Sequence, residues 1–399
     1  MLNQRSSQNF GVQNLHQLLQ VSNVNTFKKI YMFVNVDWFF YSHRLPIAKE
    51  ASLNKVNMSV YADLSNKSFE RDKKNFEVFQ SPITRNTKGI FKSLYELIKT
   101  LVLIANEKPD LVHAVTIKPI IILGLVSRLT NTPFIGAISG MGPIMNYMGL
   151  FQRFRFKIVL IIYRIIFRPR SSLIICQNEH DKNTILRNKV CNEESISVIS
   201  GSGVDLNKFR PSSERNKDTV LMACRILGDK GVREYCEAAN SYLKKYNNQI
   251  KFLLAGPIDE YSPTFISEEE ITTLCRNNGV KYLGNRSDLS QLLPRAAIFV
   301  LPSYYQEGIP KVLIEAAACG LPIITTDHPG CRDAIIEGKT GLLVKPRNKE
   351  VIVTALHKLL DNYEYSAEMG REARQFAKEK FDEKRVISQH YSLYHKLMK

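Results

Sequence analysis

The segment QEGIPKVLIEAAACGLPII (306–324) indicates how this chain is folded. A turn marked by Gly308 and Pro310 leads into an apolar run with helical spacing, because proline is tolerated at the start of a helix. Short β-branched runs lie on either side of this helix, at 297–303 and 322–327. A strand, a helix and a strand in this order predict a parallel sheet with crossover helices.

The same alternation extends along most of the chain. Six strands are predicted before a linker at 200–218 that is rich in Ser, Gly and charge, and five are predicted after it. The predicted strands are 30–36, 56–62, 110–115, 133–139, 172–177, 195–200, 219–226, 250–256, 280–284, 297–303 and 322–327. Helical spacing is found between strands at 89–105, 119–130 and 179–188, and again from about 349 onward.

We therefore predict an α/β protein with two doubly wound, Rossmann-like domains that face each other across a cleft. The N-terminal domain is predicted to comprise residues 1–203, of which 1–28 form a polar extension. The C-terminal domain is predicted to comprise 204–380, and a last helix at about 380–399 is expected to pack back on the first domain.

Composition and cysteine spacing argue against a secreted, a zinc-binding and a membrane-spanning protein. The chain has 399 residues, 44% of them apolar, which is enough to bury the cores of two domains. Its seven cysteines form no CxxC pair and no Cys/His cluster at zinc spacing, and no secretory signal opens the sequence, so we expect a reducing cytoplasm. The longest apolar run, FKIVLIIYRIIF (156–167), is shorter than the roughly 20 residues that span a bilayer.

The positive charge of the chain is concentrated in its first half. The formal net charge is +17, with 26 Lys and Arg against 13 Asp and Glu in residues 1–203, and 29 against 25 in residues 204–399. Such a field attracts anionic partners, which include nucleic acid, anionic lipid and phosphorylated substrates.

Two glutamates in the opening segment suggest a binding site for an extended ligand. Glu307 lies in the turn and Glu315 in the helix, and eight helical residues correspond to about 12 Å of rise. This is roughly the span from a sugar, across a diphosphate, to a ribose. Glu307 would hold a sugar hydroxyl, the helix start the diphosphate, and Glu315 the ribose. The alternative is that both are ordinary solvated residues.

Cations and glycines occupy the ends of other predicted strands. Arg225 and Lys230 follow the first strand of the second domain, where two cations would neutralise a diphosphate. Gly201 and Gly203, in SGSGVD (200–205), would let the backbone approach a ligand, although a hinge turn explains them equally well.

Candidate residues in the first domain lie in or after its strands. His43 and Arg44 follow the first strand, and His113 and Lys118 lie in and after a later one. These four residues are candidates for the acceptor or sugar side of the site. A lone histidine on a strand is, however, more often a hydrogen-bonded core residue.

Taken together, these motifs resemble the retaining glycosyltransferases of family 4, especially the bacterial enzymes of capsule, O-antigen or lipid-linked glycan assembly. The resemblance spans roughly residues 30–385 and rests on EGIPKVLIEAAACGLPIITTDHPGCRD, RILGDKG, SGSGVDLNKFRP and HAVTIKP. It implies a GT-B fold, a nucleotide-diphosphate sugar donor, retention of anomeric configuration and no metal or other cofactor. We expect the nucleotide of the donor to be UDP.

The resemblance also implies roles for individual residues. Glu307, Arg225 and Lys230 would act in catalysis, with Glu307 on the donor sugar and both cations on the diphosphate. The donor would also be bound by Glu315, Gly308, Ile309, Pro310, Gly203 and Arg286.

The chain departs from the family pattern at two places. Where many relatives have His-x-His, it has His113, Ala114 and Val115, so the role of the second histidine is unassigned. The usual paired-glycine loop after the first strand is replaced by DWFFYSHR (37–44).

Other functions are compatible with parts of this pattern. A sugar-nucleotide epimerase or a phosphorylase could use the same architecture, and charge alone would suit a nucleic-acid-binding protein. The chain lacks the interleaved basic and aromatic residues of a recognisable nucleic-acid-binding module, so we expect no nucleic-acid partner.

The segment LFQRFRFKIVLIIYRIIFRPR (150–170) predicts a contact with a membrane. It contains six basic residues and no acidic one. On a helix, Arg153, Lys157, Arg164 and Arg168 share one face, and the flanks and far side carry Phe154, Ile158, Ile161, Ile162 and Ile165. An alternative is a core helix with a solvated charged face.

We expect this helix, with the apolar loop SGMGPIMNYMG (139–149), to rest on an anionic membrane surface. The protein would then be cytoplasmic and peripheral on the inner face of the plasma membrane. Its acceptor would be a lipid-linked saccharide of the undecaprenyl-diphosphate type.

Overall fold

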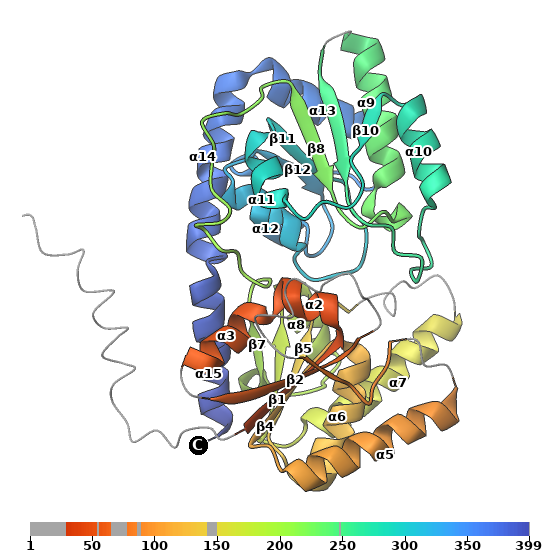
Figure 1. The fold of residues 1–399 in the computed structure, drawn as a ribbon, viewed down its shortest axis with the longest axis vertical. Coiled ribbons are helices and arrows are strands. Elements are labelled where there is room, and N and C mark those ends of the chain that lie inside the picture. The colour runs from red at the N-terminus through yellow and green to blue at the C-terminus, as the bar shows by residue number, and fades with distance from the viewer. Residues whose placement is uncertain are drawn as a thin grey trace, which may run out of the picture.

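The computed structural model describes residues 29–53, 56–64, 78–85, 89–141, 150–246 and 249–398. The predicted extension 1–28 and most of the loop 139–149 lie outside these ranges. Figure 1 shows two domains, one above the other, with the long C-terminal helices running along both.

The N-terminal domain contains a parallel sheet of seven strands in the order β3-β2-β1-β4-β5-β6-β7. Successive side chains of its central strands enter cores on opposite faces of the sheet: Tyr31 and Phe33 on one side, Ile30 and Met32 on the other. A sheet covered on both faces needs nearly continuous apolar strands. The strands are β1 (Lys29–Val36), β2 (Asn57–Asp63), β3 (Val78–Gln80), β4 (Leu111–Val115), β5 (Phe134–Ile138), β6 (Ser172–Cys176) and β7 (Ile196–Val198).

Helices cover both faces of this sheet. The neighbouring helices α5, α6 and α7 cover one face, on the lower right in Figure 1, and α2 and α3 cover the other. The helices of this domain are α2 (Asp37–His43), α3 (Leu45–Leu53), α5 (Ile90–Glu107), α6 (Ile117–Thr130), α7 (Leu150–Phe167) and α8 (Glu179–Arg187).

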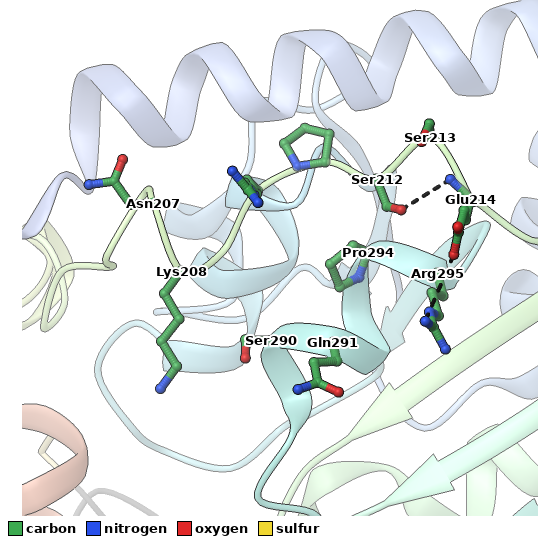
Figure 2. Close-up of a pocket in the computed structure, with 11 residues that line it drawn as sticks. Asn207, Lys208, Ser212, Ser213, Glu214, Ser290, Gln291, Pro294 and Arg295 are labelled. Carbon is green, nitrogen blue, oxygen red and sulfur yellow. Dashed lines mark hydrogen bonds and ion pairs between the residues drawn. The ribbon is translucent and has the colours of Figure 1, made fainter.

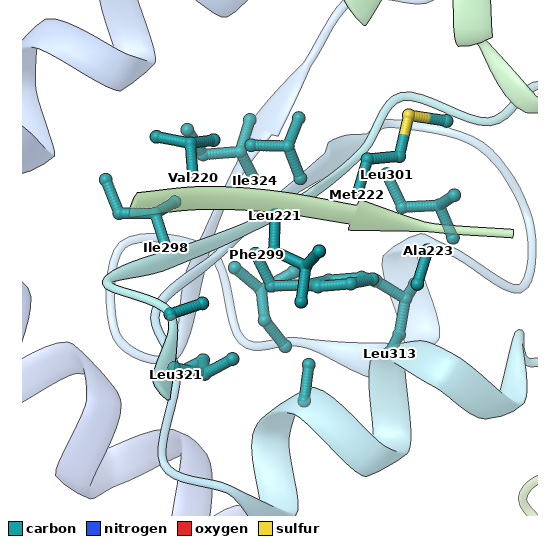
Figure 3. Close-up of a cluster of buried hydrophobic side chains, with 14 of the residues drawn as sticks. Val220, Leu221, Met222, Ala223, Ile298, Phe299, Leu301, Leu313, Leu321 and Ile324 are labelled. Carbon is teal, nitrogen blue, oxygen red and sulfur yellow. The ribbon is translucent and has the colours of Figure 1, made fainter. Parts of the chain in front are cut away.

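The C-terminal domain contains a second parallel sheet, with six strands in the order β10-β9-β8-β11-β12-β13. The central strand β8 is buried along its whole length, and Figure 3 shows Leu221 and Phe299 packed against Leu313 of α12. The strands are β8 (Thr219–Ala223), β9 (Lys251–Ala255), β10 (Val280–Tyr282), β11 (Ile298–Leu301), β12 (Ile323–Thr326) and β13 (Gly341–Val344). Its helices are α9 (Val232–Tyr246), α10 (Glu268–Asn277), α11 (Leu289–Leu292), α12 (Lys311–Ala318), α13 (Lys349–Asp361) and α14 (Tyr363–Lys380).

The chain crosses between the domains a second time before its last helix, α15 (Glu383–Leu397). At this crossing, the N–H of Val204 donates to the carbonyl of Phe381 (2.8 Å), and the N–H of Glu383 donates to the carbonyl of Val204 (3.2 Å). The two connecting segments therefore lie side by side. Beyond them, Val386 and Tyr394 of α15 enter the core of the N-terminal domain.

The structure confirms the predicted class: an α/β protein with two parallel-sheet, Rossmann-like domains. Two short strands, β3 and β13, were not indicated by the sequence pattern. The sheets span residues 29–198 and 219–344, with the linker between them.

The docking of α15 generates a prediction for Tyr394→Phe. The Tyr394 hydroxyl lies 2.9 Å from Nδ1 of His113, and both side chains are fully buried. Removing the hydroxyl leaves a buried ring nitrogen without this partner, so we expect the free energy of unfolding to fall by about 1–3 kcal/mol in denaturant titrations. The matched control is Tyr95→Phe on the exposed face of α5. Equal stability of the two variants would show that the bond contributes nothing.

Candidate functional site at the domain boundary

The turn that carries Glu307 is enclosed by backbone from both domains. The N–H of Gly308 donates to the carbonyl of Ser139 in the N-terminal domain (3.0 Å). A Cβ atom on Gly140, which has φ +100°, would lie 2.4 Å from the carbonyl carbon of Glu307. On the other side, a Cβ on Gly330 would lie 2.2 Å from the carbonyl oxygen of Gly308. Glycines therefore allow the backbone to hold this turn in place.

Glu307 forms an ion pair with Lys230, which follows β8 in a short 3₁₀ turn. The Lys230 side chain is only 7% exposed, and its ammonium also lies 5.1 Å from the centre of the Tyr305 ring. Two of the predicted catalytic residues are thus brought together. The pair is held at the carboxyl ends of adjacent strands, β8 and β11.

Arg225 lies beside this pair, between aromatic rings and a carboxylate. Its guanidinium carbon is 5.5 Å from the centre of the Tyr305 ring and 5.9 Å from the Trp38 ring of the N-terminal domain. Its Nη1 donates to Oδ2 of Asp259 (2.8 Å). Burial would lower the pKa of Arg225, but Tyr305, Glu307 and Asp259 raise it above its ordinary value.

Glu315 lies nearly buried in α12, with Lys311 one helical turn before it. Lys311 Nζ is 3.7 Å from the Glu315 carboxylate and also donates to the carbonyl of Ser42 in the N-terminal domain. Burial raises the pKa of Glu315, although the charges of Lys311 and Lys208 oppose the shift. The site therefore continues from Glu307 along α12 and stays in contact with α2.

The start of α12 differs in detail from the prediction. Pro310 is the residue that precedes the helix, which begins at Lys311, so only part of the Glu307–Glu315 spacing is helical. The buried side chain of Ile309 packs in the core of the C-terminal domain. In this structure the N–H of Gly308 faces Ser139, and a ligand phosphate at this N–H would have to displace that contact.

Two other residues that were predicted to bind the donor, Gly203 and Arg286, contact other residues of the protein. Gly203 has φ +77°, and a Cβ there would lie 2.7 Å from Cα of Glu383, so the crossing to α15 accounts for this glycine. Arg286 forms two hydrogen bonds to Asp288 and is well exposed.

The candidates for the acceptor side are mostly internal. His113 is fully buried against Tyr394, and Arg44 is 2% exposed and donates to the carbonyl of His43. Burial lowers the pKa of His113 well below its ordinary value, and lowers the pKa of Arg44 to about 10. Neither side chain is accessible to an acceptor here, which corrects the expectation from the sequence. Lys118 pairs with Glu96 (2.8 Å).

His43 lies close enough to the C-terminal domain to be affected by the charge of Lys311. Its ring stacks on Phe39 with 4.3 Å between ring centres. Burial lowers its pKa well below the ordinary value, followed by the charges of Lys311 and Arg44.

Several residues of this site were not found from the sequence. They are Trp38, Arg85, Asp259, Tyr305 and Lys311. Asp259 follows strand β9, a position at which polar residues of parallel sheets often face a ligand, and this was the signal that could have identified it.

A pocket of about 630 Å³ lies between the linker and α11. Figure 2 shows Lys208 extending from the linker toward Ser290 and Gln291 of α11. Because Lys208 also acts on the charge of Glu315, this pocket adjoins the end of the site that carries Glu315. Within the described parts of the chain, no group of three or more His, Cys, Asp or Glu side chains could hold a metal ion.

Two family models match the chain, one in each domain. Residues 204–376 match the model described as glycosyl transferases group 1, and residues 29–178 match the model described as glycosyl transferase 4-like.

Similar proteins are found among bacterial enzymes. One relative, N,N'-diacetylbacillosaminyl-diphospho-undecaprenol alpha-1,3-N-acetylgalactosaminyltransferase of Campylobacter jejuni, is 29% identical over 325 residues, which cover 78% of this chain and 82% of the relative. UDP-Gal:alpha-D-GlcNAc-diphosphoundecaprenol alpha-1,3-galactosyltransferase of Escherichia coli is 26% identical, with 71% and 74% covered.

The fold is also shared with solved structures. The structure of Anabaena Alr3699/HepE in complex with UDP and glucose superposes with a TM-score of 0.74 at 17% identity, and covers 92% of this chain and 99% of that chain.

Proposed function

Since the chain belongs to the glycosyltransferases, with a 4-like N-terminal domain and a group 1 C-terminal domain, we propose that it is a retaining enzyme that uses a UDP-sugar donor. Its acceptor in this proposal is a saccharide linked to undecaprenyl diphosphate, in the synthesis of a bacterial surface polysaccharide or glycan. The names of the relatives from Campylobacter jejuni and Escherichia coli both include an undecaprenol-diphosphate-linked sugar. The second also names a UDP-sugar.

The proposed donor site is supported by one observation: Lys230, Glu307 and Arg225 lie close together beside the start of α12. Cations and a helix start are the groups that bind a diphosphate without a metal. Glu315, about one turn into the same helix, would accept hydrogen bonds from the ribose. The donor therefore lies along α12, with its sugar at Glu307.

The proposed mechanism relies on positioning and charge. In this arrangement the acceptor hydroxyl attacks the anomeric carbon on the face that the nucleotide leaves, and the departing β-phosphate takes the hydroxyl proton. Arg225 and Lys230 stabilise the negative charge that develops on that phosphate. Glu307 holds the sugar and, through its ion pair, keeps Lys230 beside the diphosphate.

The membrane part of the proposal rests on the exposed face of α7. Phe156, Leu160 and Tyr163 face the core, whereas four apolar residues of this helix are 40–61% exposed: Phe154, Ile158, Ile161 and Ile165. They lie next to the exposed basic residues Arg153, Lys157, Arg164 and Arg168, the last of which follows the end of the helix. The prediction from the sequence placed these apolar residues on the flanks and far side; the structure exposes them together with the charges.

Helix α5 of the same domain also exposes an apolar face. Its buried face carries the polar residues Glu96 and Thr100, whereas its exposed face carries six large apolar residues that are 51–89% exposed: Ile90, Phe91, Leu94, Tyr95, Ile98 and Val102. Because α6 lies between α5 and α7, these residues belong to one side of the N-terminal domain (Figure 1). Exposed apolar helix faces can mark interaction sites, and the basic residues of α7 favour an anionic lipid surface.

No helix among the described residues combines the length and the apolar character that crossing a bilayer requires. The proposed attachment is therefore peripheral, on the cytoplasmic leaflet of the plasma membrane. In this position the enzyme would take its acceptor from the lipid surface beneath α5 and α7.

The donor proposal is tested with Glu307→Ala and Glu315→Ala. We expect both variants to lose sugar transfer while keeping the far-ultraviolet circular dichroism of the wild type, because each residue is assigned to ligand. The control is Glu364→Ala on α14, which lies outside the proposed site. Arg225→Ala should raise the barrier to turnover by about 2–4 kcal/mol, the cost of losing one oriented charge stabiliser. Near-wild-type turnover in both glutamate variants would refute the donor site.

Metal independence is a separate prediction. Because a cationic pair and a helix start are assigned to the diphosphate, we expect full turnover in excess EDTA. Strict dependence of turnover on Mg²⁺ or Mn²⁺ would argue against the proposed donor site.

The membrane contact is tested by flotation with vesicles that contain phosphatidylglycerol. We expect replacement of Arg153, Lys157, Arg164 and Arg168 with Gln to weaken vesicle binding, since each basic residue contributes about 1 kcal/mol, and to leave donor affinity unchanged. Because Arg164 also donates to the carbonyl of Asn188 (2.7 Å), a variant that retains Arg164 controls for lost structure. If the wild-type protein does not bind these vesicles at low salt, a soluble acceptor becomes the better proposal.

A further inference from the structure

One carboxylate joins the two domains beside the proposed donor site. Oδ2 of Asp259, in the loop after β9, accepts a hydrogen bond from Arg225 Nη1 (2.8 Å) and another from Arg85 Nη2 (3.3 Å). Arg225 belongs to the same domain as Asp259, whereas Arg85 follows β3 in the N-terminal domain. Both guanidinium groups thus share one oxygen atom.

This cluster is shielded enough for its charges to interact strongly. The side chain of Asp259 is 10% exposed, and those of Arg85 and Arg225 are 22% and 24% exposed. Burial would raise the pKa of Asp259, but Arg225 and Arg85 hold it below its ordinary value, so the group is ionised at neutral pH. Arg85 is held from a second side by the Tyr261 ring, 5.6 Å from its guanidinium carbon. Partly buried charges are screened little by salt.

The ion pairs of the site explain why a second arginine matters. Each of the two cations assigned to the donor diphosphate already faces a carboxylate: Lys230 faces Glu307, and Arg225 faces Asp259. If these pairs stood alone, their charges would cancel, and an incoming diphosphate would compete with Asp259 for Arg225. Arg85 donates to the same oxygen of Asp259 as Arg225 does, so the cluster of two arginines and one carboxylate has a net positive charge.

We propose that Arg85 is a positioning residue for the donor: by sharing Asp259, it leaves Arg225 able to bind the diphosphate. This inference rests on the proposed function, and it assigns to a residue of the acceptor-side domain an effect on donor binding. It also makes that effect depend on contact between the domains, since only their approach brings Arg85 to Asp259.

The test measures binding of UDP and of inorganic pyrophosphate by calorimetry, without added metal. We expect Arg85→Gln to weaken the binding of both probes about tenfold, the change typical of one coupled charge pair. In turnover assays the same variant should raise KM for the donor with little change in kcat, and Arg85→Lys should restore part of the loss. Arg187→Gln, an exposed arginine at the end of α8, removes the same charge and should have no effect.

The decisive measurement is the double variant Arg85→Gln/Asp259→Asn. Without the carboxylate, Arg225 is no longer neutralised, so binding should return toward the wild-type value. A double variant as weak as Arg85→Gln would overturn the inference, because Arg85 would then act on the ligand directly. Wild-type binding by Arg85→Gln would overturn it as well.

Arg225→Ala distinguishes this inference from the function on which it rests. Loss of binding in Arg225→Ala, with wild-type binding in Arg85→Gln, would overturn only the role of Arg85. Unchanged binding in Arg225→Ala, or no binding by the wild type, would overturn the proposed donor site and the inference together.

Discussion

The arrangement of the site depends on how closely the two backbones approach at the Glu307 turn. Gly140 from one domain and Gly330 from the other leave no room for a Cβ atom, and the turn between them is held by a hydrogen bond to Ser139. Contact between the domains therefore helps to fix Glu307, together with Gly330 of its own domain. The position of Lys230 follows from that of Glu307, because the two form an ion pair. Domain contact and the geometry of the site are thus linked in this enzyme.

Much of the fold could be predicted from the sequence because its signals are local. Strands such as β4 and β5 are short apolar runs bounded by turns, and the helix after Pro310 begins where proline allows it. The carboxyl ends of β8 and β11 could likewise be expected to carry Lys230 and Glu307, because parallel strands end at one edge of the sheet. The family resemblance supplied their proposed roles.

The remaining contacts were hidden because they join distant parts of the chain. Asp259 and Arg85 are 174 positions apart, and His113 and Tyr394 are 281 apart. No periodic pattern marks such pairs. His113 illustrates the difference: its place near the end of an apolar strand suggested a ligand contact, whereas its hydrogen-bond partner, Tyr394, lies in the last helix. The exposed apolar face of α5 was missed for a different reason, since the sequence shows that a helix is amphipathic but not which face is buried.

The second crossing between the domains also has a consequence for how this protein is made. The N-terminal domain is discontinuous in sequence, because its core includes Val386 and Tyr394 of α15, and α15 follows the whole C-terminal domain. During synthesis the second domain can therefore complete its core first. Until α15 has been synthesised, the first domain has an uncovered apolar surface at α3 and β6. The domain that is synthesised first is the last to finish folding, and in this interval it is open to chaperones and to aggregation.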